Sequence, residues 1–249
     1  MRQFGLIGFP LSHSFSKGFF AEKFAKENIE LTSYENYPIE NMDSFIALWN
    51  SNPNLEGINI TIPHKKSVIP FLNHASTVVE KIQACNCIRK YNNEWYGYNT
   101  DVIGFEQSLK PFLKPYHTKA LILGTGGAAA AVEWVLTKLN IQYQFVSRTA
   151  KPGAINYSDI SPAIMEAHTL IINTSPRGMF PNVSEAPALP YEAITSKHHL
   201  YDLIYNPALT LFLEKGKQQG ATIQNGLEML HLQAAASWEI WNAKMPFDQ

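Results

Sequence analysis

A glycine-rich segment near the middle of the chain has the residue types and the spacing that can hold a pyrophosphate. Residues 124–129 read GTGGAA, the pattern G-x-G-x-x-A. The first glycine lets the chain reverse, the second lets the backbone approach phosphate oxygens, and the small last residue lets helix and strand pack closely. Free N–H groups at the start of the following helix attract negative charge. The segment therefore predicts a dinucleotide-binding turn.

The residues after the next expected strand indicate which dinucleotide this turn serves. NAD-binding units usually place an acid there to hold the ribose 2′-hydroxyl, but no acid occurs between Glu133 and Asp159. The strand instead ends in SRT at 147–149, with Lys151 close behind. A guanidinium can bind a 2′-phosphate through paired hydrogen bonds, and a hydroxyl can assist. The pattern favours NADP(H) over NAD(H), unless Arg148 is only a solvated loop residue.

The elements around this turn alternate between strands and helices. Strands are expected at 3–8, 34–37, 57–62, 87–91, 95–98, 120–123, 142–147, 169–173, 200–203 and 222–224. Helices are expected at 17–27, 42–50, 68–72, 77–81, 102–109, 208–219 and 226–243. Within 57–62 the alternation puts Ile58, Ile60 and Ile62 on one face, and Asn59 and Thr61 on the other. Such alternation of elements implies parallel sheets with right-handed crossovers.

We therefore predict an α/β fold of two domains. Residues 1–101 form the first domain around a mostly parallel sheet, and the C-terminal helix 226–249 completes it. Residues 102–225 form a Rossmann-type domain. Pro111 and Pro115 mark the approach to the glycine turn, where the boundary is expected.

The overall composition excludes several classes of protein. The 249 residues are 45% hydrophobic and 16% charged, with a net charge of −1, so neither nucleic acid nor an anionic membrane is an expected partner. The N-terminus does not resemble a signal peptide, and no apolar run is long enough to span a membrane. Cys85 and Cys87 are too close for an ordinary disulfide and too few for a zinc site. We expect a cytoplasmic protein.

Motifs along essentially the whole chain resemble those of the shikimate dehydrogenase family. They are HSFS at 13–16, GINITIPHK at 57–65, CNC at 85–87, NTD at 99–101, GTGGA at 124–128, SRT at 147–149, NTSPRGM at 173–179, YDLIYNP at 201–207 and NGLEMLHLQ at 225–233. No single motif is decisive, but their order and spacing are specific together. The resemblance implies reversible, NADPH-dependent reduction of 3-dehydroshikimate to shikimate, on the route to chorismate and the aromatic amino acids. It also implies that the N-terminal domain is a substrate domain with a three-layer α/β/α architecture, separated by a cleft from the NADP-binding domain.

The resemblance also implies roles for individual residues. Hydride transfer to a ring carbon requires a proton for its oxygen, and Lys65 is the implied acid/base, held by Asp101; the alternative for Lys65 is an ordinary solvated lysine, as we expect for Lys66. The implied substrate contacts are Ser14, Ser16, Asn59, Thr61, Lys65, Asn86, Asp101, Tyr205 and Gln233. The implied NADP(H) contacts are Gly124, Thr125, Gly126, Gly127, Ala128, Ser147, Arg148, Thr149, Asn173, Thr174, Ser175, Met179, Gly226 and Met229. Lys65, Asp101 and Gln233 would face the nicotinamide, in a monomer or a homodimer.

Several alternatives stay open at this point. Ser16 can instead be an ordinary helix cap, and Gln233 a buried glutamine bonded to backbone. The chain departs from the family's pattern at Lys17, His64 and Cys87, where proline, an aromatic residue and threonine are usual. A quinate/shikimate dehydrogenase with relaxed specificity is the nearest rival function. A non-catalytic metabolite sensor is the rival from another class, although a sensor would be expected to lose the proton-transfer pair.

Overall fold

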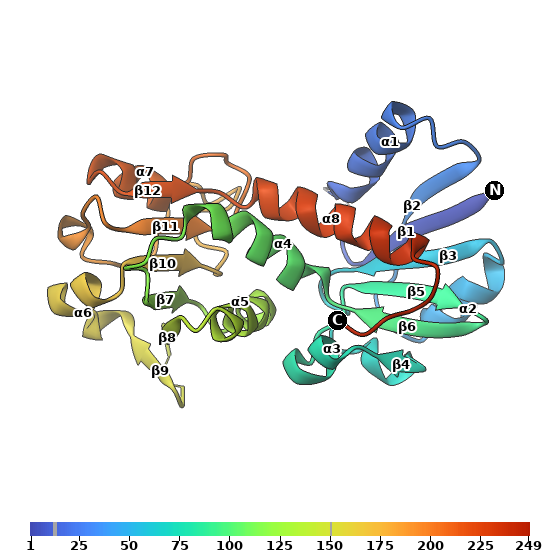
Figure 1. Ribbon diagram of the computed structural model, residues 1–249, viewed down its shortest axis with the longest axis horizontal. Helices are drawn as coiled ribbons and strands as arrows, with labels where there is room; N and C mark the ends of the chain where they lie inside the picture. Colours follow the sequence, from blue (N-terminus) through green and yellow to red (C-terminus); the bar gives the residue numbers. More distant parts are fainter. Residues whose placement is uncertain (12–13, 150) are drawn as a thin grey trace. The chain divides into compact units, whose positions relative to one another are not determined.

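The chain folds into two compact units. The computed structural model describes residues 1–11, 14–149 and 151–249 (Figure 1); His13 of the first motif lies outside them. Unit 1 contains Met1–Ile103 and Gln233–Gln249, and unit 2 contains Gly104–Leu232. The chain crosses between the units inside two helices, α4 (Thr100–Leu109) and α8 (Leu227–Asn242). A crossing inside a helix carries no change of composition, so the sequence could give its place only approximately.

The sheet of unit 1 is mixed, because it contains both parallel and antiparallel strand pairs. In order across the sheet the strands are β2 (Thr32–Pro38), β1 (Arg2–Gly8), β3 (Leu55–Ile60), β5 (Cys87–Tyr91), β6 (Glu94–Tyr98) and β4 (His74–Ala75). β1 is parallel to β2 and β3, whereas β5 is antiparallel to β3 and β6. Asn92 and Asn93 close the β5–β6 hairpin with φ values of 51° and 62°, which asparagine tolerates well. The predicted hairpin is confirmed.

Unit 1 is layered because its strands bury side chains on both faces. Its helices are α1 (Ser16–Lys26), α2 (Ser44–Ser51), α3 (Thr77–Ile82), the short turn Ile69–Phe71 and the parts of α4 and α8 that belong to it. On one face Phe4 stacks on Trp241 of α8, with ring centroids 4.7 Å apart. On the other face Ile7 packs with Phe45 and Trp49 of α2. The alternation along β1 separates these two cores.

The sheet of unit 2 has the strand order of a Rossmann fold. Across the sheet the strands are β12 (Thr222–Gln224), β11 (His199–Asp202), β10 (Leu170–Asn173), β7 (Lys119–Leu123), β8 (Gln142–Ser147) and β9 (Ala154–Asn156). These strands pair in parallel. The first strand in the sequence, β7, lies between β8 and β10, so the strand order reverses there. Ligands of such sheets bind outside the carboxyl ends of the strands at this reversal.

Short helices connect the strands of unit 2. They are α5 (Gly127–Lys138), α6 (Pro162–Ala167) and α7 (Leu211–Gln218), together with short 3-10 turns at Lys110–Phe112, Tyr157–Asp159 and Tyr191–Ala193. Its core includes Leu121, Leu123, Val146, Ile171 and Leu200, which are fully buried. The predicted α/β class, with a Rossmann-type domain and a second α/β domain, is confirmed.

Two local predictions are wrong. Strand β3 ends at Ile60, and Ile62 is 73% exposed rather than aligned with Ile58 and Ile60. The chain turns there because the N–H of His64 donates to the carbonyl of Thr61, just beyond the strand. Ser16 does not cap a helix: it is the first residue of α1, and Phe15 occupies the cap position without a side-chain cap bond. The sequence prediction also missed the short strand β9.

Candidate active site

Lys65 and Asp101 form an ion pair in unit 1. Lys65 Nζ lies 2.7 Å from Asp101 Oδ2, and the two side chains are 27% and 16% exposed. The pair is therefore partly shielded from water but still accessible to a small molecule. The neighbouring Lys66 is exposed, which agrees with the expectation that it is a solvated lysine.

Buried neighbours hold the backbone of Lys65. The N–H of Cys85 donates to the Lys65 carbonyl at 2.8 Å. The adjacent His64 is 3% exposed, and its Nε2 donates to the carbonyl of Ile39 at 2.7 Å. His64, at a position where the family usually has an aromatic residue, is thus a core residue with a hydrogen-bond partner. Lys65 follows β3 in a turn that is fixed on both sides.

The other member of the pair, Asp101, lies in the first turn of α4. Asn99 sets the start of this helix, because its Oδ1 accepts from the Asp101 N–H at 3.1 Å and its Nδ2 donates to the Ala84 carbonyl at 2.8 Å. Asn86 holds the residue between them. Its Oδ1 accepts from the Thr100 N–H at 2.6 Å, and its Nδ2 donates to Thr100 Oγ1 at 3.1 Å. These amides orient the carboxylate by fixing the helix that carries it.

Asn59 belongs to a buried hydrogen-bond network next to this pair. Its Oδ1 accepts from the Tyr34 hydroxyl at 3.0 Å, and its Nδ2 donates to Ser237 Oγ at 2.8 Å and to the Asn86 carbonyl at 3.2 Å. The oxygen and both N–H groups of this amide thus have partners inside the protein. The geometry makes Asn59 a residue that joins β2, β3 and α8.

Gln233 faces the same network from α8. Its Oε1 accepts from Thr100 Oγ1 at 3.4 Å, and its carbonyl accepts from Ser237 Oγ at 3.0 Å. Lys65, Asn86, Asp101 and Gln233 were predicted from motifs far apart in the sequence. The fold of unit 1 brings all four into one polar cluster.

The hydroxyls of Ser14, just before α1, and of Ser16, at its first position, differ in their hydrogen bonds. Ser14 Oγ is buried and has no hydrogen-bond partner among the residues that the structure describes. Such a group costs free energy unless a ligand or water completes it. Ser16 contacts the hydroxyl of Tyr34. Burial raises the pKa of Tyr34, and the hydrogen bond with Ser16 opposes that rise. Thr61 is half-buried just after β3.

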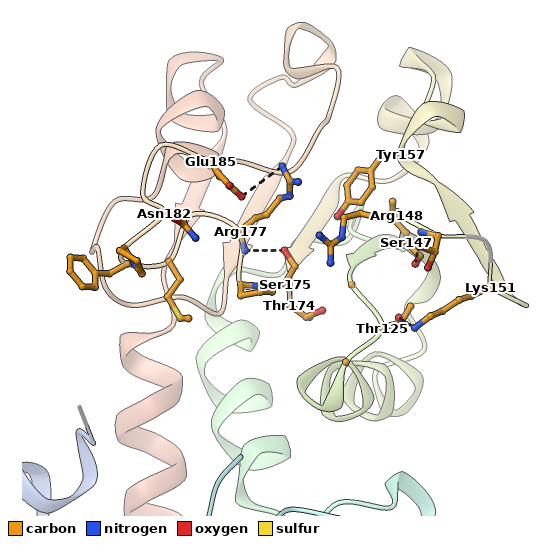
Figure 2. A pocket seen from close by; sticks show the side chains of 18 residues that line it. Thr125, Ser147, Arg148, Lys151, Tyr157, Thr174, Ser175, Arg177, Asn182 and Glu185 are labelled. Carbon is orange, nitrogen blue, oxygen red and sulfur yellow. Dashed lines mark hydrogen bonds and ion pairs between the residues drawn. The ribbon is translucent and has the colours of Figure 1, made fainter. Parts of the chain in front are cut away.

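Unit 2 contains a pocket of about 670 Å³ at the reversal of its strand order (Figure 2). Four segments line it: the glycine turn after β7, the end of β8 with the residues that follow it, the turn that begins at Tyr157 after β9, and the loop after β10. The predicted cofactor contacts that line it are Gly124, Thr125, Gly126, Ser147, Arg148, Thr149, Thr174, Ser175 and Met179. The sequence motifs therefore converge on one concave surface.

The structure gives one reason for glycine at position 124 of the turn and another for glycine at positions 126 and 127. Gly124 has a φ of +116°, and a Cβ there would lie 2.8 Å from Thr174 Oγ1. A Cβ on Gly126 or Gly127 would meet nothing within 4 Å, so these two border open space. Gly126 is the N-cap of α5 and provides no side-chain cap bond. The first N–H groups of α5 are therefore left for a ligand.

Positive and aromatic side chains surround the outer part of the pocket. Lys151 Nζ donates to Thr125 Oγ1 at 2.7 Å, which joins the end of β8 to the glycine turn. Arg148 and Arg177 both line the pocket, and both also border an adjoining cavity of about 290 Å³ with Tyr157. Burial raises the pKa of Tyr157, and the positive charges of Arg177 and Arg148 oppose that rise.

The side chain of Asn173, which is buried outside the pocket, holds the loop after β10 in place. Asn173 is fully buried, and its Oδ1 accepts from Ser175 Oγ at 2.7 Å and from the Ser175 N–H at 3.1 Å. Its Nδ2 donates to Asp202 Oδ1 at 3.0 Å. Burial raises the pKa of Asp202 to about 6, while bonds from Thr210, Ile204 and Asn173 act against it. Asn173 thus positions the loop from behind.

Some predicted contacts lie outside the pocket of unit 2. Gly127, Ala128, Asn173, Gly226 and Met229 do not line it, and neither does Tyr205, which is 36% exposed. Position 226 requires glycine for a structural reason, since a Cβ there would collide with the carbonyl of Leu203. Conversely, sequence reasoning did not identify Tyr157, Arg177, Asn182 or Glu185, which do line the pocket. Tyr157 and Glu185 lie outside every recognised motif, and Arg177 carries no signal of its own inside one.

The two cysteines, Cys85 and Cys87, are free thiols buried in unit 1. Among residues 1–11, 14–149 and 151–249 there is no group of three or more His, Cys, Asp or Glu side chains that could hold a metal ion. Burial raises the pKa of Cys85 to about 12 and raises that of Cys87 further. Cys87 packs in the core of unit 1. None of the helices in these residues is long and apolar enough to cross a membrane.

These features define an α/β protein in which a Rossmann-type unit accompanies a second α/β unit. Residues 6–88 match the family model described as the shikimate dehydrogenase substrate binding domain. The NADP(+) shikimate dehydrogenase of Methanosphaera stadtmanae is 33% identical over 97% of this chain and 92% of its own length. That of Carboxydothermus hydrogenoformans is 35% identical over the same shares. The chain belongs to the shikimate dehydrogenase family.

Solved structures agree with this assignment. The shikimate 5-dehydrogenase of Thermus thermophilus, in complex with NADP(H) and shikimate, superposes with a TM-score of 0.87. It is 27% identical in sequence, and the match covers 99% of this chain and 95% of that one. The similarity therefore extends over both units of the fold.

Proposed function

We propose that this protein is an NADP-dependent shikimate dehydrogenase, which reversibly reduces 3-dehydroshikimate to shikimate. Unit 1 is the substrate domain and unit 2 the NADP domain. The observation that carries the proposal is the 2.7 Å pair of Lys65 and Asp101 in a polar cluster of unit 1. Membership of the family and the named activity of the relatives support the same reaction. The location in the cytoplasm and the oligomeric state remain predictions from the sequence.

The proton of the reaction is assigned to Lys65. When the ketone is reduced, hydride adds to its carbon and the oxygen takes a proton, so a positioned acid is needed. Lys65 donates that proton from its ammonium, and it removes the proton again in the oxidation direction. Asp101 holds Nζ in place and shares the contact with the hydroxyl. Hydrogen bonds to the backbone of Lys65, and from the amide side chains at the start of α4, fix both residues. The pair is therefore preorganised for this transfer.

The remaining polar groups of unit 1 orient the substrate. Ser14 and Ser16 bind the carboxylate, and the buried Ser14 Oγ without a partner supports that role. Thr61, Asn86 and Gln233 contact the ring hydroxyls. We assign Asn59 to positioning, since its amide groups are already occupied by Tyr34, Ser237 and Asn86.

The pocket of unit 2 fits NADP(H), which supplies or accepts the hydride when it is bound. The open space at Gly126 and Gly127 and the uncapped start of α5 suit a pyrophosphate. Arg148 stands at the end of β8, the position from which a residue reaches the ribose 2′ substituent. Thr174, Ser175 and Met179 line the far wall from the loop after β10. Asn173 supports that loop. Gly226 and Met229 also contact NADP(H) in this proposal, and Tyr205 contacts the substrate.

The role of Lys65 can be tested against its neighbour. Lys65→Met should lower kcat by about 100-fold or more, the usual contribution of a general acid/base, while shikimate still binds within a few-fold of the wild-type Kd. Lys66→Met, which removes an adjacent exposed lysine, should leave both quantities unchanged. Turnover and calorimetric binding would be measured for both variants. Near-normal turnover in Lys65→Met would remove Lys65 from the chemistry.

A further inference from the structure

Arg177 is a positive side chain in the pocket of unit 2 that the dinucleotide-binding pattern does not require. It lines the 670 Å³ pocket and, together with Arg148, the adjoining 290 Å³ cavity. We propose that Arg177 is a second determinant of cofactor choice, which binds the 2′-phosphate of NADP(H) from the side opposite Arg148. The inference rests on the proposed function and adds a residue to it.

The two arginines converge although they come from different strands. Arg148 follows β8, and Arg177 lies in the loop after β10, with β7 between these strands in the sheet. In Figure 2 Tyr157 lies beside Arg148, with the guanidinium group of Arg177 to the left of both, and the charges of both arginines act on the Tyr157 hydroxyl. An anion placed beside Tyr157 would therefore be within reach of two guanidinium groups and one hydroxyl. A dianionic phosphate matches this set of donors.

The backbone of Arg177 is held in place. Its N–H donates to Ser175 Oγ at 3.4 Å, and its carbonyl accepts from Asn173 Nδ2 at 3.4 Å. The next residue, Gly178, has a φ of +93° and ends the turn. A guanidinium on an ordered loop loses less conformational freedom when it binds than one on a freely moving chain.

Glu185 keeps the guanidinium of Arg177 near the pocket without occupying its donors. Arg177 NH1 and Glu185 Oε2 are 3.9 Å apart, and the side chains are 38% and 48% exposed. That distance is too long for a hydrogen bond, so the N–H groups remain available to a phosphate. The carboxylate also lines the pocket, and it would repel a phosphate if Arg177 did not stand between them.

Arg177 could alternatively stack on the adenine, which NADP and NAD share. The two roles are separated by comparing adenosine 2′,5′-bisphosphate with adenosine 5′-phosphate, because only the first carries the 2′-phosphate. Calorimetric Kd values would be measured for the wild type and for Arg177→Met, Arg148→Met and Lys217→Met. Lys217 is an exposed lysine of α7 outside the pocket, so its variant controls for the loss of one positive charge.

The expected result is selective. Arg177→Met should weaken the bisphosphate by about 10-fold and the monophosphate by less than about 2-fold, as should Arg148→Met, whereas Lys217→Met changes neither. Retained monophosphate binding shows that the variant is folded.

Two results would overturn the inference. If Arg177→Met weakens both nucleotides equally or neither, while Arg148→Met still acts on the bisphosphate alone, Arg177 has no role in cofactor choice and the proposed function stands. If the wild type itself does not prefer the bisphosphate, the NADP selectivity of the proposed function fails as well.

Discussion

At the scale of single residues, hydrogen-bond partners separate a side chain that we assign to ligand binding, such as Ser14, from one that holds the protein together, such as Asn59. Asn59 was predicted in the same terms, yet its side chain holds the protein together. Ser14 Oγ instead has no partner in the described residues. A sequence pattern identifies which polar residues gather at a site, but their hydrogen bonds depend on packing from segments far along the chain.

Removing the Ser14 hydroxyl should therefore affect ligand binding more than stability. We expect Ser14→Ala to weaken shikimate by roughly 10-fold, since one charge-assisted hydrogen bond is lost, with NADP affinity unchanged. The free energy of unfolding should not fall, because an unsatisfied group is removed. Ser33→Ala is the matched control, since Ser33 Oγ is also buried without a partner among the described residues. Equal shikimate affinity in wild type and Ser14→Ala would return Ser14 to a structural role.

At the scale of elements, local patterns predicted regular strands well and loop convergence poorly. The bounds of β8 and β12 agree with the prediction because apolar runs and turn residues delimit them. The three-residue strand β9 escaped because its half-buried residues leave no period. Tyr157 and Arg177 were missed as site residues for a related reason: they meet only through the pairing of β8 with β9 and β10 with β7.

Strand β11 carries a buried histidine that should make stability depend on pH. His199 is fully buried, and burial lowers its pKa from 6.5 to about 4. Between these values the unfolded chain binds a proton that the folded protein does not. The stabilisation is therefore complete above about pH 6.5 and is lost as the pH falls toward 4. The loss amounts to roughly 3 kcal/mol.

The variant His199→Gln isolates this titration from the opposing one of Asp202. We expect the free energy of unfolding of the wild type, relative to the variant, to fall as the pH is lowered from 7 to about 4. Urea denaturation at several pH values measures it. A difference that stays constant over this range would show that His199 titrates normally in the folded protein.

At the scale of the whole molecule, each unit has a core of its own, and we propose a separate ligand site for each. The clusters around Phe4 and Ile7 belong to unit 1, and the cluster around Leu121 belongs to unit 2. The Rossmann topology was predictable, because glycine turn, strand length and alternation agree. The residues at which the chain passes between units were not, since helices continue through both crossings.

Ligands should consequently protect different segments from hydrogen exchange. Shikimate is expected to slow exchange of amides around residues 61–65 and 86–101, whereas NADP should slow exchange around 124–128 and 174–179. Mass spectrometry of peptides from the intact protein measures both. Protection by NADP confined to unit 1 would contradict the assignment of the two sites.

The most direct test of the account is a steady-state assay of the purified protein that follows the absorbance of the reduced nicotinamide. Shikimate and quinate would each be oxidised with NADP and with NAD, giving four values of kcat/KM. The account predicts that shikimate with NADP is the best combination, by at least about 10-fold over each of the others, a preference of roughly 1.4 kcal/mol or more. Equal use of quinate or of NAD would contradict it, and no turnover in any combination would favour a binding protein built on the same fold.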